Sequence, residues 1–129
     1  AVLYGNNGRL LSFKINGRSK LPILNKRDQI IPEQPLMSAG AEDILMGEKL
    51  YSNYCGACHG AGVRGKAIVD LRHLTKEKHE IFNDIVLGGM LEESGMANFS
   101  SLINKKETEQ IHSYIINTAT KARSKQLNK

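Results

Sequence analysis

The feature that most constrains this chain of 129 residues is the run Cys55-Gly56-Ala57-Cys58-His59, with the spacing C-x-x-C-H. Two residues between the cysteines place both thiols along one helical turn, and the imidazole follows at once. This is the spacing at which two thiols attach to the vinyl groups of a haem while the histidine binds the iron. A histidine would seldom follow a C-x-x-C pair by chance, because only 4 of the 129 residues are histidine. The run therefore predicts one covalently attached haem, with His59 as an iron ligand.

Two other chemistries use a cysteine pair at this spacing. A thioredoxin-type redox pair lies at the start of a helix in a strand-helix-strand unit, whereas Cys55 and Cys58 follow a predicted helix. A zinc site is a closer alternative, since His73 and His79 complete the spacing C-x2-C-x14-H-x5-H. Such a finger would leave His59 and the long helices without a role. We favour the haem and keep a zinc-binding nucleic-acid module as a remote alternative.

Hydrophobic periodicity and capping residues predict three helices. The first spans about residues 41–54, with acidic residues in its first turn. The second begins after Thr75 and ends at Gly88-Gly89. The third starts at Asn104, where Glu107 three residues later predicts a capping box. Their apolar stripes consist of Ile44, Gly47, Tyr51 and Tyr54; of Ile81, Phe82, Ile85 and Val86; and of Ile111, Tyr114, Ile115 and Thr118.

The first forty residues have a different pattern. In residues 1–17, two apolar runs flank Gly5-Asn6-Asn7-Gly8, which predicts a β-hairpin that ends at Asn16-Gly17. Residues 18–40 lack periodicity and are punctuated by prolines, which is typical of an extended linker; the prolines are Pro22, Pro32 and Pro35.

The predicted fold class is therefore mainly α, with residues 41–120 as the helical domain and residues 121–129 as a basic tail. This tail is predicted to be the solvated, frayed end of the last helix. Only 5% of the chain is aromatic and tryptophan is absent, so the core is aliphatic or is completed by a group from outside the polypeptide. A net charge of +5 is modest for a nucleic-acid binder. No apolar run approaches the ~18 residues of a membrane span.

A sixth iron ligand has several candidates. Met37 and Met46 precede the attachment run, and Met46 lies within a predicted helix, where a role in the core is favoured. Met90 follows the second helix. Met96 lies in an irregular loop after Gly95, where a small residue lets the backbone approach a haem closely. Spacing favours Met96 over Met90 and leaves three histidines as less favoured ligands: His73, His79 and His112.

Together these motifs resemble a class I c-type cytochrome, and more narrowly the C-terminal haem domain of quinohaemoprotein (PQQ-dependent) alcohol dehydrogenases. The residues 4–14 are similar to a strand pair of the last propeller blade of those enzymes. The resemblance covers residues 1–118 and rests on these further runs: Tyr51–Gly60, Asp70–Arg72, Ile85–Gly89 and Gly95–Phe99. It implies a cytochrome c-like helical domain around a covalent haem, and a chain that is the carboxy-terminal piece of a longer enzyme.

The resemblance also assigns residues to the haem. It implies thioether links at Cys55 and Cys58, proximal and distal iron ligation by His59 and Met96, and a contact between Arg72 and a haem propionate. Two positions depart from the family pattern. Val69 stands where a proline usually precedes Asp-Leu-Arg, although its carbonyl can still accept the ring N–H of His59. Ala97 replaces the usual proline after the distal methionine.

The function that the resemblance implies is electron transfer. Electrons would come from a PQQ-containing dehydrogenase domain of the same parent chain and pass to a periplasmic acceptor such as a cytochrome or a copper protein. PQQ and calcium would belong to that missing domain, and the present chain is expected to have no catalytic site of its own. A free-standing soluble carrier is the alternative. Arg64, Lys66 and Arg72 near the attachment run either guide an acidic partner or keep the surface soluble. The sequence from residue 1 onward has neither the basic region nor the apolar region of an export signal, so we expect that a signal has been removed.

Overall fold

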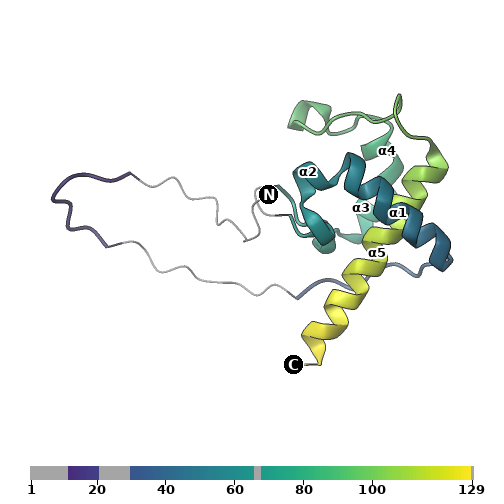
Figure 1. The fold of residues 1–129 in the computed structure, drawn as a ribbon, viewed down its shortest axis with the longest axis horizontal. Helices are drawn as coiled ribbons and strands as arrows, with labels where there is room; N and C mark the ends of the chain where they lie inside the picture. The colour runs from purple at the N-terminus through teal and green to yellow at the C-terminus, as the bar shows by residue number, and fades with distance from the viewer. Residues whose placement is uncertain (1–11, 21–29, 66–67, 129) are drawn as a thin grey trace.

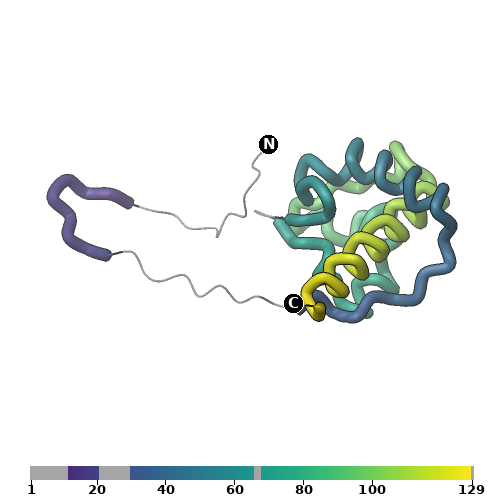
Figure 2. The backbone as a smooth tube through the Cα atoms, turned by 60° about the horizontal axis from the view of Figure 1, so that its bottom comes forward, coloured from purple at the N-terminus to yellow at the C-terminus, as the bar shows by residue number. Residues whose placement is uncertain are grey.

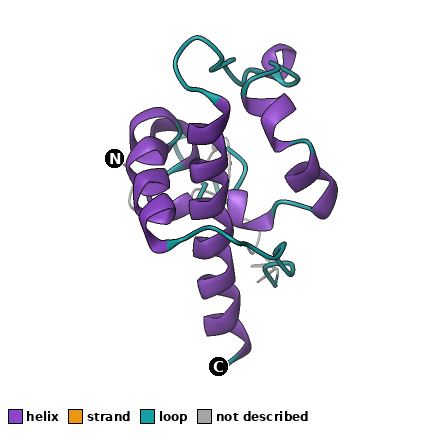
Figure 3. Cartoon of the chain, turned by 90° about the vertical axis from the view of Figure 1, so that its right-hand side faces the viewer, coloured by secondary structure: helices purple, strands orange, loops and turns teal. Residues whose placement is uncertain are grey.

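A computed structural model describes residues 12–20, 30–65 and 68–128. These residues form helices and loops without a β-strand, as Figures 1 and 3 show. The α-helices are α1 (Ala41–Tyr54), α2 (Gly56–His59), α3 (Lys76–Glu80), α4 (Phe82–Val86) and α5 (Lys105–Leu127); three short 3-10 turns are η1 (Ala61–Val63), η2 (Leu71–His73) and η3 (Glu92–Ser94). The predicted mainly α class is confirmed.

Helices α1 and α5 cross at the centre of the fold (Figures 1 and 3). Helix α1 has the predicted bounds, and Gly47 and Tyr51 form its buried face. A Cβ atom built on Gly47 would lie 2.0 Å from the carbonyl oxygen of Gln110, so the two backbones approach more closely than any side chain allows. Beside this contact, the ring centroids of Tyr51 and Tyr114 are 5.4 Å apart. The crossing therefore depends on a glycine at residue 47.

Helix α5 begins with the predicted capping box. The side chain of Asn104 accepts a hydrogen bond from the Glu107 N–H at 3.0 Å, and the Asn104 N–H donates to Glu107 Oε2 at 2.8 Å. The helix continues to Leu127, so most of the predicted basic tail is helical. The described residues contain no helix that is both long and apolar enough to cross a membrane.

The end of α5 holds the segment that precedes α1. Ile31 is only 1% exposed, and its backbone N–H donates to Gln126 Oε1 at 3.0 Å. The carbonyl of Ile31 accepts a hydrogen bond from Arg123 Nη1. Figure 2 shows this segment passing the C-terminal end of α5 before it turns into α1. Residues 30–40 have no regular secondary structure, yet they are anchored to the domain rather than free of it.

The predicted β-hairpin is not supported. Its first strand and its first turn lie outside the described residues, and residues 12–20 form no strand. They do form the predicted second turn, since Asn16 has φ 62° and the Gly17 N–H donates to the Lys14 carbonyl at 2.9 Å. The physical reason is that an isolated hairpin is marginal in water. Phe13 and Ile15 are 82% and 90% exposed.

The second predicted helix is divided into α3 and α4 at Ile81, whose φ of −100° and ψ of 18° leave the helical region. Phe82 and Val86 join the core from α4, together with residues from α1, η1 and α5. One expectation for the core is wrong. Met46 is 43% exposed, so it lies on a face of α1 that is in contact with solvent.

Candidate haem site

The attachment run begins where α1 ends. The backbone N–H of Cys55 donates to the Tyr51 carbonyl at 2.8 Å, and the next four residues form α2. Gly60 follows with φ 77°, and a Cβ there would lie 2.4 Å from the Arg64 carbonyl oxygen. Both cysteines are free thiols, with Cys55 half-buried and Cys58 exposed. The run is therefore one short helical turn that the chain leaves sharply through a glycine.

The ring of His59 is oriented by the backbone. Its Nδ1 lies 3.1 Å from the carbonyl oxygen of Val69. A carbonyl oxygen only accepts hydrogen bonds, so this contact requires the proton on Nδ1 and leaves the lone pair on Nε2. This is the arrangement of a metal-binding histidine whose second nitrogen is held by the protein. The predicted contact with Val69 is confirmed, although a valine replaces the expected proline.

The electrostatics of Cys55 oppose a thioredoxin-type site. Burial, and secondarily the nearby Cys58, raise the pKa of the Cys55 thiol to about 11. A redox-active cysteine needs the opposite shift, because the thiolate is its reactive form. A neutral, half-buried sulfur suits an apolar neighbour such as a porphyrin edge.

The zinc alternative is wrong. No cluster of three or more His, Cys, Asp or Glu side chains suited to a metal ion occurs among the residues that the structure describes. His79 instead contacts His112 on α5, with His79 Nδ1 2.8 Å from His112 Nε2 and the rings stacked at 5.1 Å. Burial lowers the pKa of both histidines. Two of the three histidines considered as sixth ligands are thus engaged with each other.

The loop that carries Met96 is docked against the attachment run. Gly95 precedes Met96 with φ 89°, and the Met96 N–H donates to the Leu91 carbonyl at 3.1 Å. The ring of Phe99 packs edge-on against Tyr54, the residue before Cys55, at 6.4 Å. Met96 is half-buried and packs against the core, whereas Met90 is 55% exposed. The aromatic pair Tyr54 and Phe99 was not anticipated from the sequence, because the two residues lie far apart along the chain.

Arg72 has a partner that the sequence analysis missed. Asp70 accepts hydrogen bonds from the Arg72 backbone N–H at 3.0 Å and from its Nε at 2.9 Å, and it forms an ion pair with Nη2. The hydrogen bond with Asp70 raises the pKa of Arg72. The spacing Asp-x-Arg at the start of a turn was a local indication of this pair. Nη1 of Arg72 forms no hydrogen bond with another described residue.

Comparison with known families agrees with this site. Residues 42–115 match the family described as cytochrome C oxidase, cbb3-type, subunit III. The chain belongs to this family of cytochrome c domains. The matched range includes α1 except its first residue, the attachment run, the Met96 loop and just under half of α5. Because haem c is the cofactor of such domains, the family supports the predicted haem.

The relatives of the domain include quinohaemoprotein dehydrogenases. The chain is 38% identical to quinohemoprotein alcohol dehydrogenase ADH-IIG of Pseudomonas putida, over 86% of its own length and 15% of that protein. It is 34% identical to ADH IIB of the same organism, over 86% of its length and 16% of that protein. It is 31% identical to the dehydrogenase subunit of the alcohol dehydrogenase (quinone) of Acetobacter aceti, over 88% of its length and 16% of that protein.

A solved structure is also similar. The structure of quinohemoprotein alcohol dehydrogenase ADHIIG from Pseudomonas putida HK5 matches with a TM-score of 0.72 and 35% identity, over 86% of this chain and 16% of that chain. The chain thus spans about a sixth of the length of its relatives. These comparisons confirm the predicted resemblance and the predicted cytochrome c-like fold.

Proposed function

We propose that this domain transfers electrons through one covalently bound c-type haem. In this proposal Cys55 and Cys58 form the thioether links, and His59 and Met96 are the axial ligands. The haem iron supplies a one-electron redox couple. The observation that carries the proposal is the contact of 3.1 Å between His59 Nδ1 and the Val69 carbonyl. It holds the imidazole in the protonation state and orientation that iron ligation requires.

The protein's own part is to hold the ligands and exclude water. The edge-on contact of Phe99 with Tyr54 keeps the Met96 loop next to the attachment run, so the distal ligand comes from an anchored loop. Leu71 and Leu74 are half-buried against the same core and supply the apolar surroundings of the cofactor. Ligation by methionine and histidine raises the reduction potential of a c-type haem, which suits an acceptor of electrons from a reduced quinone cofactor.

For Arg72 we propose a contact with a haem propionate through Nη1. Asp70 already holds Nε and Nη2, so the guanidinium is oriented and its remaining edge is available. A charge-assisted hydrogen bond of this kind is stronger than a neutral one. Asp70 also keeps Arg72 from being an unpaired cation before the cofactor is bound.

For the partners we propose a PQQ- and calcium-containing dehydrogenase domain as the electron donor and a periplasmic cytochrome or copper protein as the acceptor. The support is that the relatives are quinohaemoprotein alcohol dehydrogenases in which the matched region is a small part of a longer chain. Covalent haem attachment supports an exported compartment, the bacterial periplasm. A free-standing carrier would have the same haem chemistry but no donor domain in its own chain.

The first test is a reduced-minus-oxidised absorption spectrum of the chain, expressed together with a haem-attachment system. We expect c-type haem bands, and their absence would refute the electron-transfer proposal. The second test compares Met96→Ala with Met90→Ala. The first variant should lose the sulfur-to-iron absorption band and have a lower reduction potential, while the second should keep both. The reverse result would assign the distal ligand to Met90.

A further inference from the structure

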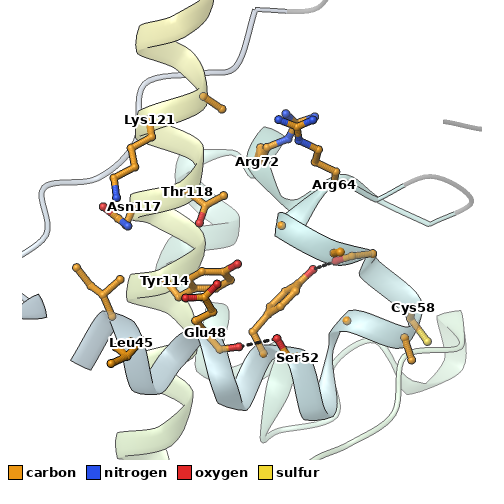
Figure 4. A pocket seen from close by; sticks show the side chains of 18 of the residues that line it. Leu45, Glu48, Ser52, Cys58, Arg64, Arg72, Tyr114, Asn117, Thr118 and Lys121 are labelled. Carbon is orange, nitrogen blue, oxygen red and sulfur yellow. Dashed lines mark hydrogen bonds between the residues drawn. The ribbon is translucent and has the colours of Figure 1, made fainter. Parts of the chain in front are cut away.

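A large groove runs along the crossing of α1 and α5, on the side where the attachment run turns. Its volume is about 1280 Å³, and it is bounded by α1, by α2 and η1, and by the C-terminal half of α5 (Figure 4). Neither His59 nor Met96 lines it, so it is separate from the proposed axial ligands. Cys58, a proposed attachment residue, lies at one end. A partner seated in the groove would therefore contact the attachment turn.

The floor of the groove is apolar and aromatic. Ile44 and Leu45 line it along α1, and the largely buried rings of Tyr51 and Tyr114, which are 1% and 8% exposed, lie beside them. Tyr51 is held in place because its hydroxyl donates to the Gly60 carbonyl at 2.8 Å. Leu45 is 54% exposed, so part of the apolar floor is in contact with solvent. Such a surface gains free energy when a partner's apolar side chains cover it.

The walls of the groove are basic on both sides. Arg64 and Arg72 lie together on one side of the groove, and Lys121 extends from α5 toward Asn117 on the other side, as Figure 4 shows. Lys125 adds a further cation on α5, one turn beyond Lys121. Glu48 is the acidic residue that lines the groove. The groove is therefore lined by four basic residues and one acidic residue.

Three of these four cations are available to a partner. Among the described residues, Arg72 forms an ion pair with Asp70. Within the same part of the chain, no acidic partner is found for Arg64, Lys121 or Lys125. Arg64 and both lysines are exposed. Exposed cations with no acidic neighbour favour the approach of a negatively charged surface and are screened by salt.

We propose that this groove is the docking surface for the electron-accepting protein, and that it binds a segment in which carboxylates flank apolar side chains. The apolar side chains would cover Ile44 and Leu45, and the carboxylates would pair with Arg64 and Lys121 on the two walls. The assignment to an electron acceptor rests on the proposed function. Binding of such a segment does not rest on the proposed function, because it requires no change in the redox state of the groove residues.

The test is a binding measurement with the haem-loaded chain. The probe is a fluorescently labelled peptide of ten residues in which leucines alternate with pairs of glutamates, and anisotropy reports binding. We expect saturable binding at low ionic strength. The double variant Arg64→Glu/Lys121→Glu should bind at least about tenfold more weakly, since two facing contacts become repulsive. Binding to the parent chain should also weaken as the ionic strength rises from about 0.01 M to 0.15 M, as the Debye length falls from about 30 Å to about 8 Å.

The matched control is Lys49→Glu/Lys106→Glu, which lowers the net charge by the same amount. Both lysines are exposed on α1 and α5, and neither lines the groove. The control should bind the peptide within about threefold of the parent chain. Equal weakening by the two double variants would overturn the proposal, because net charge alone would then explain binding. No binding to the parent chain would overturn it as well. If haem bands are present and binding is absent, docking fails while the proposed function stands; if binding occurs without haem bands, the proposed function fails.

Discussion

The crossing of α1 and α5 makes Gly47→Ala the most informative stability variant. The new Cβ would lie 2.0 Å from the Gln110 carbonyl oxygen and 2.5 Å from its carbon, whereas ordinary contact begins at 3.4 Å. The neighbouring atoms belong to the backbone of α5, so no side-chain rotation can remove the clash. The helices must separate locally by about 1.4 Å at residue 47.

This separation loosens the packing around the crossing. A gap of 0.5–1 Å already forfeits about a quarter to a half of the van der Waals attraction across an interface. Tyr51 and Ile111, which are 1% and 0% exposed, lie beside the crossing. We take about 3 kcal/mol for overpacking and about 1 kcal/mol for the loosened ring contact of Tyr51 with Tyr114. Alanine restores about 1 kcal/mol through its higher helix propensity. The free energy of unfolding should therefore fall by about 3 kcal/mol.

The assay is urea denaturation followed by far-UV circular dichroism on haem-loaded protein. The matched control is Gly40→Ala, because a Cβ at Gly40 would meet nothing within 4 Å and the backbone φ of −74° suits alanine. Replacing the glycine at the helix N-cap should lower the free energy of unfolding of this control by less than about 1 kcal/mol. If Gly47→Ala were as stable as the control, the close crossing of α1 and α5 at this residue would be refuted.

Two further predictions concern α5. Burial, and secondarily the charge of His79, lower the pKa of His112 from 6.5 to about 4. The unfolded chain therefore binds more protons than the folded chain between about pH 6.5 and pH 4, so stability should fall across this window as the pH decreases, by up to about 3 kcal/mol. Denaturation curves at pH 7 and pH 4.5 measure this, and His112→Gln should flatten the difference; an unchanged slope would contradict it. Asn104→Ala removes the capping box and should lower the unfolding free energy by about 1 kcal/mol, while Asn104→Asp should retain it, as thermal melts of the two variants can establish.

Features that depend on neighbours in the sequence were predictable. The bounds of α1 and the capping box at Asn104 were predicted, because acidic first-turn residues, hydrophobic periodicity and cap spacing act within one or two turns. The orientation of His59 by the Val69 carbonyl was also predicted, since only ten residues separate them and the family pattern marks the position. The pair of Asp70 and Arg72 was equally local and was overlooked.

Features that depend on distant neighbours were not predictable. The contact of Tyr54 with Phe99 joins segments 45 residues apart, and the anchoring of Ile31 by Gln126 joins segments 95 residues apart. The engagement of His79 with His112 removed two candidate ligands that spacing had left open. No local pattern distinguishes a histidine that will meet another histidine from one that will meet solvent.

The sequence by itself predicted the chemistry that we propose for this protein, because covalent haem attachment depends on two thiols and an imidazole within five consecutive residues. Only the tertiary structure decided which methionine is anchored beside that run and which cations line a common groove. The first depends on Phe99 packing against Tyr54, and the second on α5 bringing Lys121 to the groove that Arg64 also lines. Both result from close packing between helices, and packing depends on shape in three dimensions rather than on the order of residues along the chain.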